Sequence, residues 1–72
     1  MINIRLDHVL LDRRMKLKDL SEATGLAVNN LSILKTNKAR AIRFSTLNSL
    51  CEALDCAPGD LIEYIRDEDA ST

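Results

Sequence analysis

Side chains that can read the edges of base pairs are concentrated in residues 27–35. Asn29 and Asn30 carry amides that match N6 and N7 of adenine, and two nearby aliphatic side chains could pack on thymine methyl groups. Leu31 and Leu34 form the apolar stripe of a predicted helix, which leaves its opposite face for contact. A solvated first turn for the asparagines, and helix packing for the two aliphatic residues, are the alternatives. The candidate base-reading residues are Val28, Asn29, Asn30, Ser32 and Ile33.

Basic side chains flank this predicted helix at both ends. Residues 13–43 carry eight basic and two acidic residues, a net charge of +6, whereas residues 44–72 carry one basic and seven acidic residues, a net charge of −6. The net charge of the whole chain is −1, but phosphate binding needs a local basic face rather than a basic average. The alternative is that these charges only solvate a loop. The candidate phosphate-contacting residues are Lys16, Lys18, Lys35, Thr36, Lys38 and Arg40.

A helix-turn-helix over about residues 17–35 would position these side chains. Leu17, Leu20 and Ala23 repeat at helical spacing, and Gly25 stands where a helix ends in the left-handed conformation that glycine adopts without steric cost. Two helices with so short a connection must cross steeply. The second helix of such a unit can enter the major groove of DNA.

The rest of the chain predicts further short elements around this unit. Helices are expected over residues 6–14, from an N-cap at Ser45 to about residue 55, and from Pro58 to about residue 63. Residues 2–4 alternate as in a strand, and an extended Tyr64-Ile65 could pair with them. The apolar stripe of the first of these helices comprises Leu6, Val9, Leu10 and Leu11.

Length and composition exclude several classes of protein. The 72 residues fit one domain over residues 1–66 followed by a flexible acidic tail over residues 67–72. No run approaches the roughly 20 apolar residues that span a bilayer, and the first residues do not read as a signal peptide. We therefore expect a cytoplasmic protein that does not span a membrane.

No arrangement of side chains suggests catalysis, a metal or a cofactor. Cys51 and Cys56 are five residues apart, which is not a zinc-ligand spacing, and His8 has no partner in the pattern. Cys51 falls on an apolar stripe and is expected to be a core thiol, while a redox role for Cys56 is an alternative. We expect neither enzyme activity nor a bound cofactor.

Several segments resemble the lambda-repressor-like helix-turn-helix family, also called the Xre or Cro-type family. The helix-turn-helix part is carried by Asp19-Leu20-Ser21, Thr24-Gly25-Leu26, Leu31-Ser32 and Leu34. Residues 39–47, 50–54 and 56–65 are similar to a branch of very small bacterial and phage regulators. The resemblance implies a mainly α, compact five-helix domain, with a small two-stranded pairing of the N-terminal and C-terminal segments.

The resemblance also implies how such a domain binds DNA, and where this chain departs from the family. It implies a homodimer on a palindromic operator, and Arg43 matches a position from which an arginine can enter the minor groove. Ala27 and Leu17 replace a usual Ser and Gln, which puts two of the family's contacts in doubt. Lys35 and Asn37 replace a usual Glu and Gly, and the added base favours phosphate binding.

The expected function is therefore that of a sequence-specific, double-stranded-DNA-binding transcriptional regulator, a repressor acting as a homodimer. The alternative is a protein-interaction module or an antitoxin-like partner of another protein. An apolar patch near the end of the chain is the expected dimer interface. It comprises Leu61, Ile62, Tyr64 and Ile65.

Overall fold

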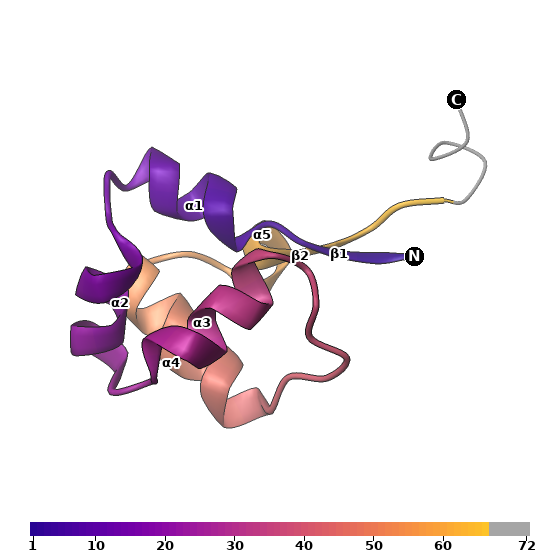
Figure 1. Cartoon of the computed structure of the whole chain (residues 1–72). Coiled ribbons are helices and arrows are strands. Elements are labelled where there is room, and N and C mark those ends of the chain that lie inside the picture. The colour runs from indigo at the N-terminus through magenta and orange to yellow at the C-terminus, as the bar shows by residue number, and fades with distance from the viewer. Residues whose placement is uncertain (67–72) are drawn as a thin grey trace.

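The computed structural model describes residues 1–66 and shows a small helical domain closed by a two-stranded ribbon (Figure 1). The predicted acidic tail, residues 67–72, lies outside the described residues. The mainly α, five-helix architecture with paired terminal segments is confirmed. In chain order the elements are β1 (Ile2–Ile4), α1 (Leu6–Asp12), α2 (Leu17–Thr24), α3 (Val28–Lys35), α4 (Phe44–Leu54), α5 (Pro58–Leu61) and β2 (Ile62–Tyr64).

Leucine side chains from all five helices form the core. Leu20 and Leu31 are fully buried where α2 meets α3, as the predicted helical stripes require. Leu11 is wrong as a core residue, because its side chain is 77% exposed. Only one face of α1 can meet the core, and Leu11 points to the other. The buried set is Leu6, Val9, Leu10, Leu20, Leu31, Leu34, Leu50, Leu54 and Leu61.

The two ends of the chain meet in an antiparallel ribbon of β1 and β2. Ile4 pairs with Ile62 and Ile2 with Tyr64, so these four side chains share one face. The predicted pairing is confirmed, but the second strand begins earlier than expected. Residue 62 is already extended, with φ −129° and ψ 129°, since pairing with β1 replaces further helical turns after Leu61.

Hydrogen bonds from small side chains close the turn between α2 and α3. Gly25 has φ +76°, the predicted left-handed conformation, and its amide donates to the carbonyl oxygen of Ser21 at 2.8 Å. The Thr24 hydroxyl donates to the Leu20 carbonyl at 2.7 Å and accepts from the Leu26 amide at 3.2 Å. These bonds fix the angle at which α3 leaves α2.

Replacing Gly25 with Ala is expected to lower the free energy of unfolding by about 1–2 kcal/mol, because a Cβ strains a left-handed residue. Space is not the cause, since a Cβ at this position would meet no atom within 4 Å. Gly59→Ala is the matched control: that site is equally open but lies in α5 without a positive φ. We expect it to be neutral or stabilising by up to about 1 kcal/mol. Urea denaturation measures both, and equal effects would contradict the role given to the turn.

Helix α4 starts two residues earlier than predicted, because its N-cap is Arg43 and not Ser45. Arg43 occupies that position in an extended conformation, with φ −77° and ψ 147°, and no side chain caps the helix. The helix ends at Asp55, which has φ +50°. Pro58 then begins α5 as expected, and the Asp60 carboxylate accepts from the Ala57 amide at 2.9 Å.

Candidate nucleic-acid interface

Helix α3 is buried along one side only. Leu31 and Leu34 anchor it against the core, and the helix lies in front of α4 in Figure 1, at the outside of the domain. It packs on both α1 and α2. The opposite side of α3 is therefore free to meet another molecule.

The predicted base-reading residues lie on or beside this free side. Val28 and Ile33 are 46% and 44% exposed, so neither is packed into the domain's interior. Asn29 and Asn30 are exposed, and Ser32 is half-buried. Their side chains can reach a surface placed against α3 without any change in the fold.

A surface hollow brings Arg43 together with two of these residues. The hollow has a volume of about 510 Å³ and lies between α3 and the segment that follows it. Asn30 and Ile33 line it from α3, and Arg43 lines it from the start of α4. The residue predicted to enter the minor groove thus lies beside the helix predicted to enter the major groove.

Residues 36–43, which we call the basic loop, follow α3 and bow away from it in Figure 1. Ala39 and Ile42 turn inward and pack against the core, whereas Lys38 and Arg40 are exposed. The apolar residues thus hold part of the loop against the core, and the basic residues beside them point to solvent.

The six candidate cations are exposed, and none forms an ion pair with an acid in residues 1–66. They are Lys16, Lys18, Lys35, Lys38, Arg40 and Arg43. Lys16 and Lys18 stand apart from the hollow, at the beginning of α2. Charges without acidic partners keep their full attraction for phosphate groups.

Thr36 differs from the other phosphate-contact candidates. Its hydroxyl donates to the carbonyl oxygen of Ser32 at 2.9 Å, at the end of α3. That proton is therefore engaged within the protein, and a contact of Thr36 with phosphate stays a prediction.

Two of the four positions at which the chain departs from the family pattern, Leu17 and Ala27, offer no polar side chain to a ligand. Leu17 packs against the core. Ala27 is the N-cap residue of α3, and no side chain caps that helix. At the start of α2, the carboxylate of Asp19 accepts from the Lys16 amide at 3.1 Å.

Leu61 is wrong as a member of an exposed dimer patch, because only 2% of it is exposed. Leu61 is the last residue of the one-turn helix α5, and it is the residue through which α5 contacts the core. Ile62 and Ile65 are half-buried, and Tyr64 is 70% exposed opposite Ile2 on the ribbon. Ile62 and Tyr64 share one face of the ribbon and can still form a smaller patch, whereas Ile65 follows Tyr64 on the opposite face.

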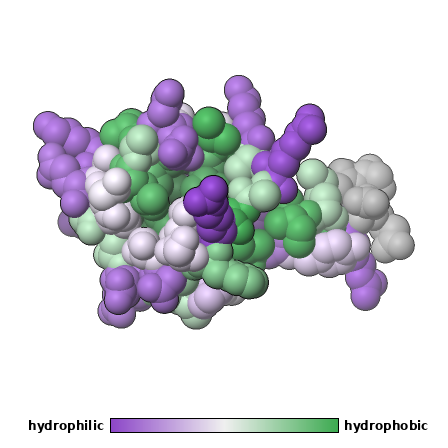
Figure 2. All heavy atoms as spheres, turned by 90° about the horizontal axis from the view of Figure 1, so that it is seen from below, coloured by the Kyte–Doolittle hydropathy of each residue, from purple (hydrophilic) through white to green (hydrophobic). Residues whose placement is uncertain are grey.

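Phe44 is an exposed aromatic side chain that the sequence interpretation did not single out. It is 87% exposed and is the first residue of α4. The view of the domain from below shows apolar surface interrupted by projecting polar side chains (Figure 2). One feature of the sequence indicated that Phe44 could be exposed, namely its place in a basic segment without a helical repeat.

The remaining candidates for chemistry do not form a reactive site within residues 1–66. Cys51 and Cys56 are free, half-buried thiols. Burial raises the pKa of the Cys56 thiol, and the adjacent Cys51 raises it further. No three potential metal ligands gather in the described part of the chain, and none of its helices has the length and apolarity needed to cross a bilayer.

Comparison with known proteins agrees with this geometry. Residues 5–67 match the family described as the Cro/C1-type HTH DNA-binding domain. The chain therefore belongs to the Cro/C1-type helix-turn-helix DNA-binding family. It is also 53% identical over 68 residues to a Bacillus subtilis (strain 168) protein named "Uncharacterized HTH-type transcriptional regulator YozG", covering 94% of this chain and 81% of that protein. No solved structure gives a significant match.

Proposed function

We propose that this protein is a sequence-specific transcriptional regulator that binds a palindromic operator as a homodimer and represses by covering a promoter. The observation that carries the proposal is α3, which is anchored on one side and exposes amide and aliphatic side chains on the other. Exposed cations that form no ion pair with an acid of residues 1–66 lie at its end and in the basic loop. This combination supplies both kinds of contact that operator recognition needs.

Base reading is assigned to α3. The Asn29 amide can bond to an adenine edge, and Ile33 can contact a thymine methyl group. No arginine or lysine stands among the base-reading candidates of this helix, so guanine has no strong partner there. We therefore expect an A·T-weighted half-site, with Arg43 attracted to a narrow minor groove beside it.

Phosphate contacts are assigned to the exposed cations and are tested by the salt dependence of binding. Lys38→Ala should weaken binding to all duplexes by a similar factor. The slope of log K against log salt should become shallower by about 0.9 for each phosphate group that the variant no longer neutralises. Fluorescence anisotropy with a labelled 24-bp duplex between 50 and 200 mM KCl measures both quantities.

The control for this experiment is Arg66→Ala, which removes an exposed positive charge from the acidic part of the chain. We expect its salt slope to match that of the unaltered protein. Equal slopes for all three proteins would contradict the assignment of Lys38 to the phosphate backbone.

The homodimer is assigned to the patch formed by Ile62 and Tyr64. Tyr64→Ser should raise the dimer dissociation constant about tenfold, because aromatic residues dominate the energy of interfaces of this kind. Sedimentation equilibrium measures the change. The control is Phe44→Ser, which removes the other highly exposed aromatic side chain and should leave the dissociation constant unchanged. If only the Phe44→Ser variant dissociated, the dimer interface would lie at α4 and not at the ribbon.

A further inference from the structure

We propose that Asn37 is a positioning residue for DNA binding, which ties the basic loop to the terminal ribbon so that Lys38 and Arg40 meet the phosphate backbone in a fixed place. This inference rests on the proposed function. It adds a role for the ribbon, whose residues 2–4 carry none of the predicted DNA contacts.

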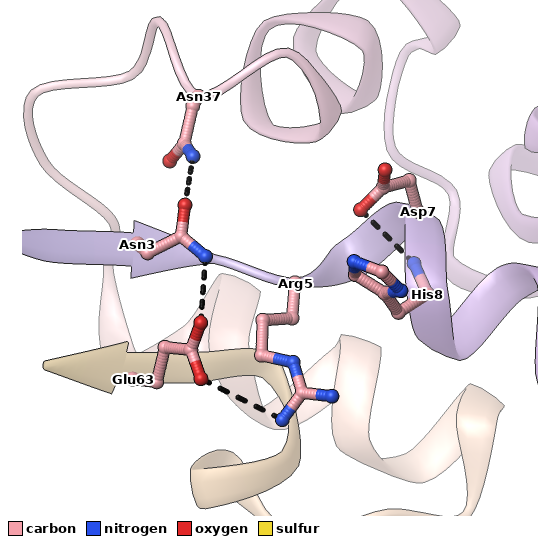
Figure 3. Close-up of polar contacts among 6 residues, drawn as sticks. All are labelled: Asn3, Arg5, Asp7, His8, Asn37 and Glu63. Carbon is pink, nitrogen blue, oxygen red and sulfur yellow. Dashed lines mark hydrogen bonds and ion pairs between the residues drawn. The ribbon is translucent and has the colours of Figure 1, made fainter. Parts of the chain in front are cut away.

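Asn37 stands at the point where α3 gives way to the basic loop. Its φ is +64°, a conformation that asparagine tolerates better than most residues. Its backbone N–H donates to the Leu34 carbonyl oxygen at 3.1 Å. The side chain turns toward β1, as Figure 3 shows. Its Oδ1 accepts from the Ile4 amide at 2.9 Å, and its Nδ2 donates to Oδ1 of Asn3.

The hydrogen bonds continue across the ribbon. Nδ2 of Asn3 donates to Oε1 of Glu63 at 2.8 Å, and Oε2 of Glu63 lies 3.7 Å from a guanidinium nitrogen of Arg5 (Figure 3). A backbone amide can only donate, so the atom of Asn37 that faces Ile4 must be its oxygen. The orientation of each next side chain then follows, and each amide nitrogen in the series donates to an oxygen of the next residue. We call the series Asn37–Asn3–Glu63 the tether.

The tether spans a place where the basic loop and the ribbon are not closely packed against each other, although Ala39 and Ile42 pack against the core. An apolar hollow of about 210 Å³ lies between the ribbon and the loop, with Ile2, Ile4 and Ile62 on one side and Ala39 and Ile42 on the other. Side chains that do not fill the space between two segments restrain them less than close packing does. The hydrogen bonds of Asn37 therefore supply a restraint at the end of the loop nearest Lys38.

A restrained loop binds DNA better because less conformational freedom is lost when its cations meet phosphates. The tether lies at the surface, since Asn37 is exposed and the core consists of aliphatic side chains on the helices. Its loss should therefore affect the loop more than the stability of the domain. This separates a positioning role from a structural one.

Asn37→Gly is the direct test, because glycine accepts φ +64° without strain and removes the side-chain bonds. Glycine also adds backbone freedom, so Asn3→Ala, which breaks the tether without changing residue 37, accompanies it. We expect its affinity for a random-sequence 24-bp duplex at 100 mM KCl to fall about three- to tenfold, with a salt slope shallower by about 0.9–1.8. The thermal midpoint should change little. The control is Asn48→Ala, which removes the side chain of an exposed asparagine on α4 and should bind DNA as the unaltered protein does. Alanine is used there instead of glycine because glycine would weaken the helix.

A rescue experiment separates the hydrogen bonds from the residues that make them. Asn3→Ala should reproduce part of the decrease in affinity. The double variant Asn3→Asp with Glu63→Gln keeps the net charge and keeps the tether with one bond reversed, since the new carboxylate can accept from both amides. It also removes the exposed ion pair with Arg5, which contributes little. We expect this double variant to bind within about twofold of the unaltered protein.

Two results would overturn the inference. One is an Asn37→Gly variant with unchanged affinity and salt slope. The other is an Asn37→Gly variant that binds more weakly only because it is less stable. Its affinity would recover at low temperature, and its slope of log K against log salt would be unchanged. If the unaltered protein binds no duplex, the proposed function itself fails, and this outcome is distinct from both.

Discussion

Replacing Leu31 with Ala is expected to lower the free energy of unfolding by about 2–5 kcal/mol. Leu31 is fully buried and holds α3 against the rest of the domain. Truncating it removes apolar packing and leaves a cavity where the helices meet. Because domains are stable by only about 5–15 kcal/mol, and small ones lie at the low end, the variant should be close to unfolding at 25 °C.

Leu11→Ala provides the matched control, since it makes the same chemical change at a side chain that is 77% exposed. We expect its effect to stay within about 0.5 kcal/mol. Urea denaturation followed by circular dichroism gives both values. Similar decreases in the two variants would contradict the burial of α3 described above.

Replacing Asn29 with Ala is expected to weaken binding to the preferred operator by about 1–3 kcal/mol, roughly 5- to 150-fold. The variant should also lose the preference for one base pair in each half-site, because the amide that reads it is gone. Folding should be unaffected, since Asn29 is exposed on α3. Anisotropy titrations on the operator and on duplexes altered at single base pairs measure both effects.

Asn48→Ala is again the appropriate control, as an exposed asparagine on a helix other than α3. It should leave affinity and sequence preference unchanged. An Asn29→Ala variant with full operator affinity would show that α3 does not read bases through this residue.

The helix-turn-helix could be predicted from the sequence because each signal was local. Gly25 marks a left-handed turn, and Leu31 with Leu34 marks a one-sided helix. Pro58 marks a helix start for an equally local reason. In each case the physical cause lies within a few residues of its effect.

The errors concern positions decided by distant contacts. Leu11 extends an apolar run, but α1 packs on the core with one face only, and Leu11 lies on the other face. Ser45 is a good capping residue, but Arg43 holds the N-cap position. Leu61 was assigned to a surface patch because one helical turn gives no periodicity to show which residue is buried.

The tether was invisible in the sequence for the same reason. Asn3 and Asn37 are separated by 34 residues, and each alone reads as an ordinary polar residue. Only the ribbon register, which places Asn3 opposite Glu63, makes them part of one network. Its effect on DNA binding, like the assignment of individual base and phosphate contacts, is a prediction for experiment.

Sequence-specific recognition by α3 is best tested by selecting bound oligonucleotides from a random double-stranded pool at 50 and 200 mM KCl. We expect a palindromic, A·T-weighted motif at both salt concentrations, with half-sites about one helical turn apart and much weaker overall retention at the higher one. Retention of the pool without enrichment of any motif would contradict base reading by α3, and would favour a protein-interaction module over a regulator.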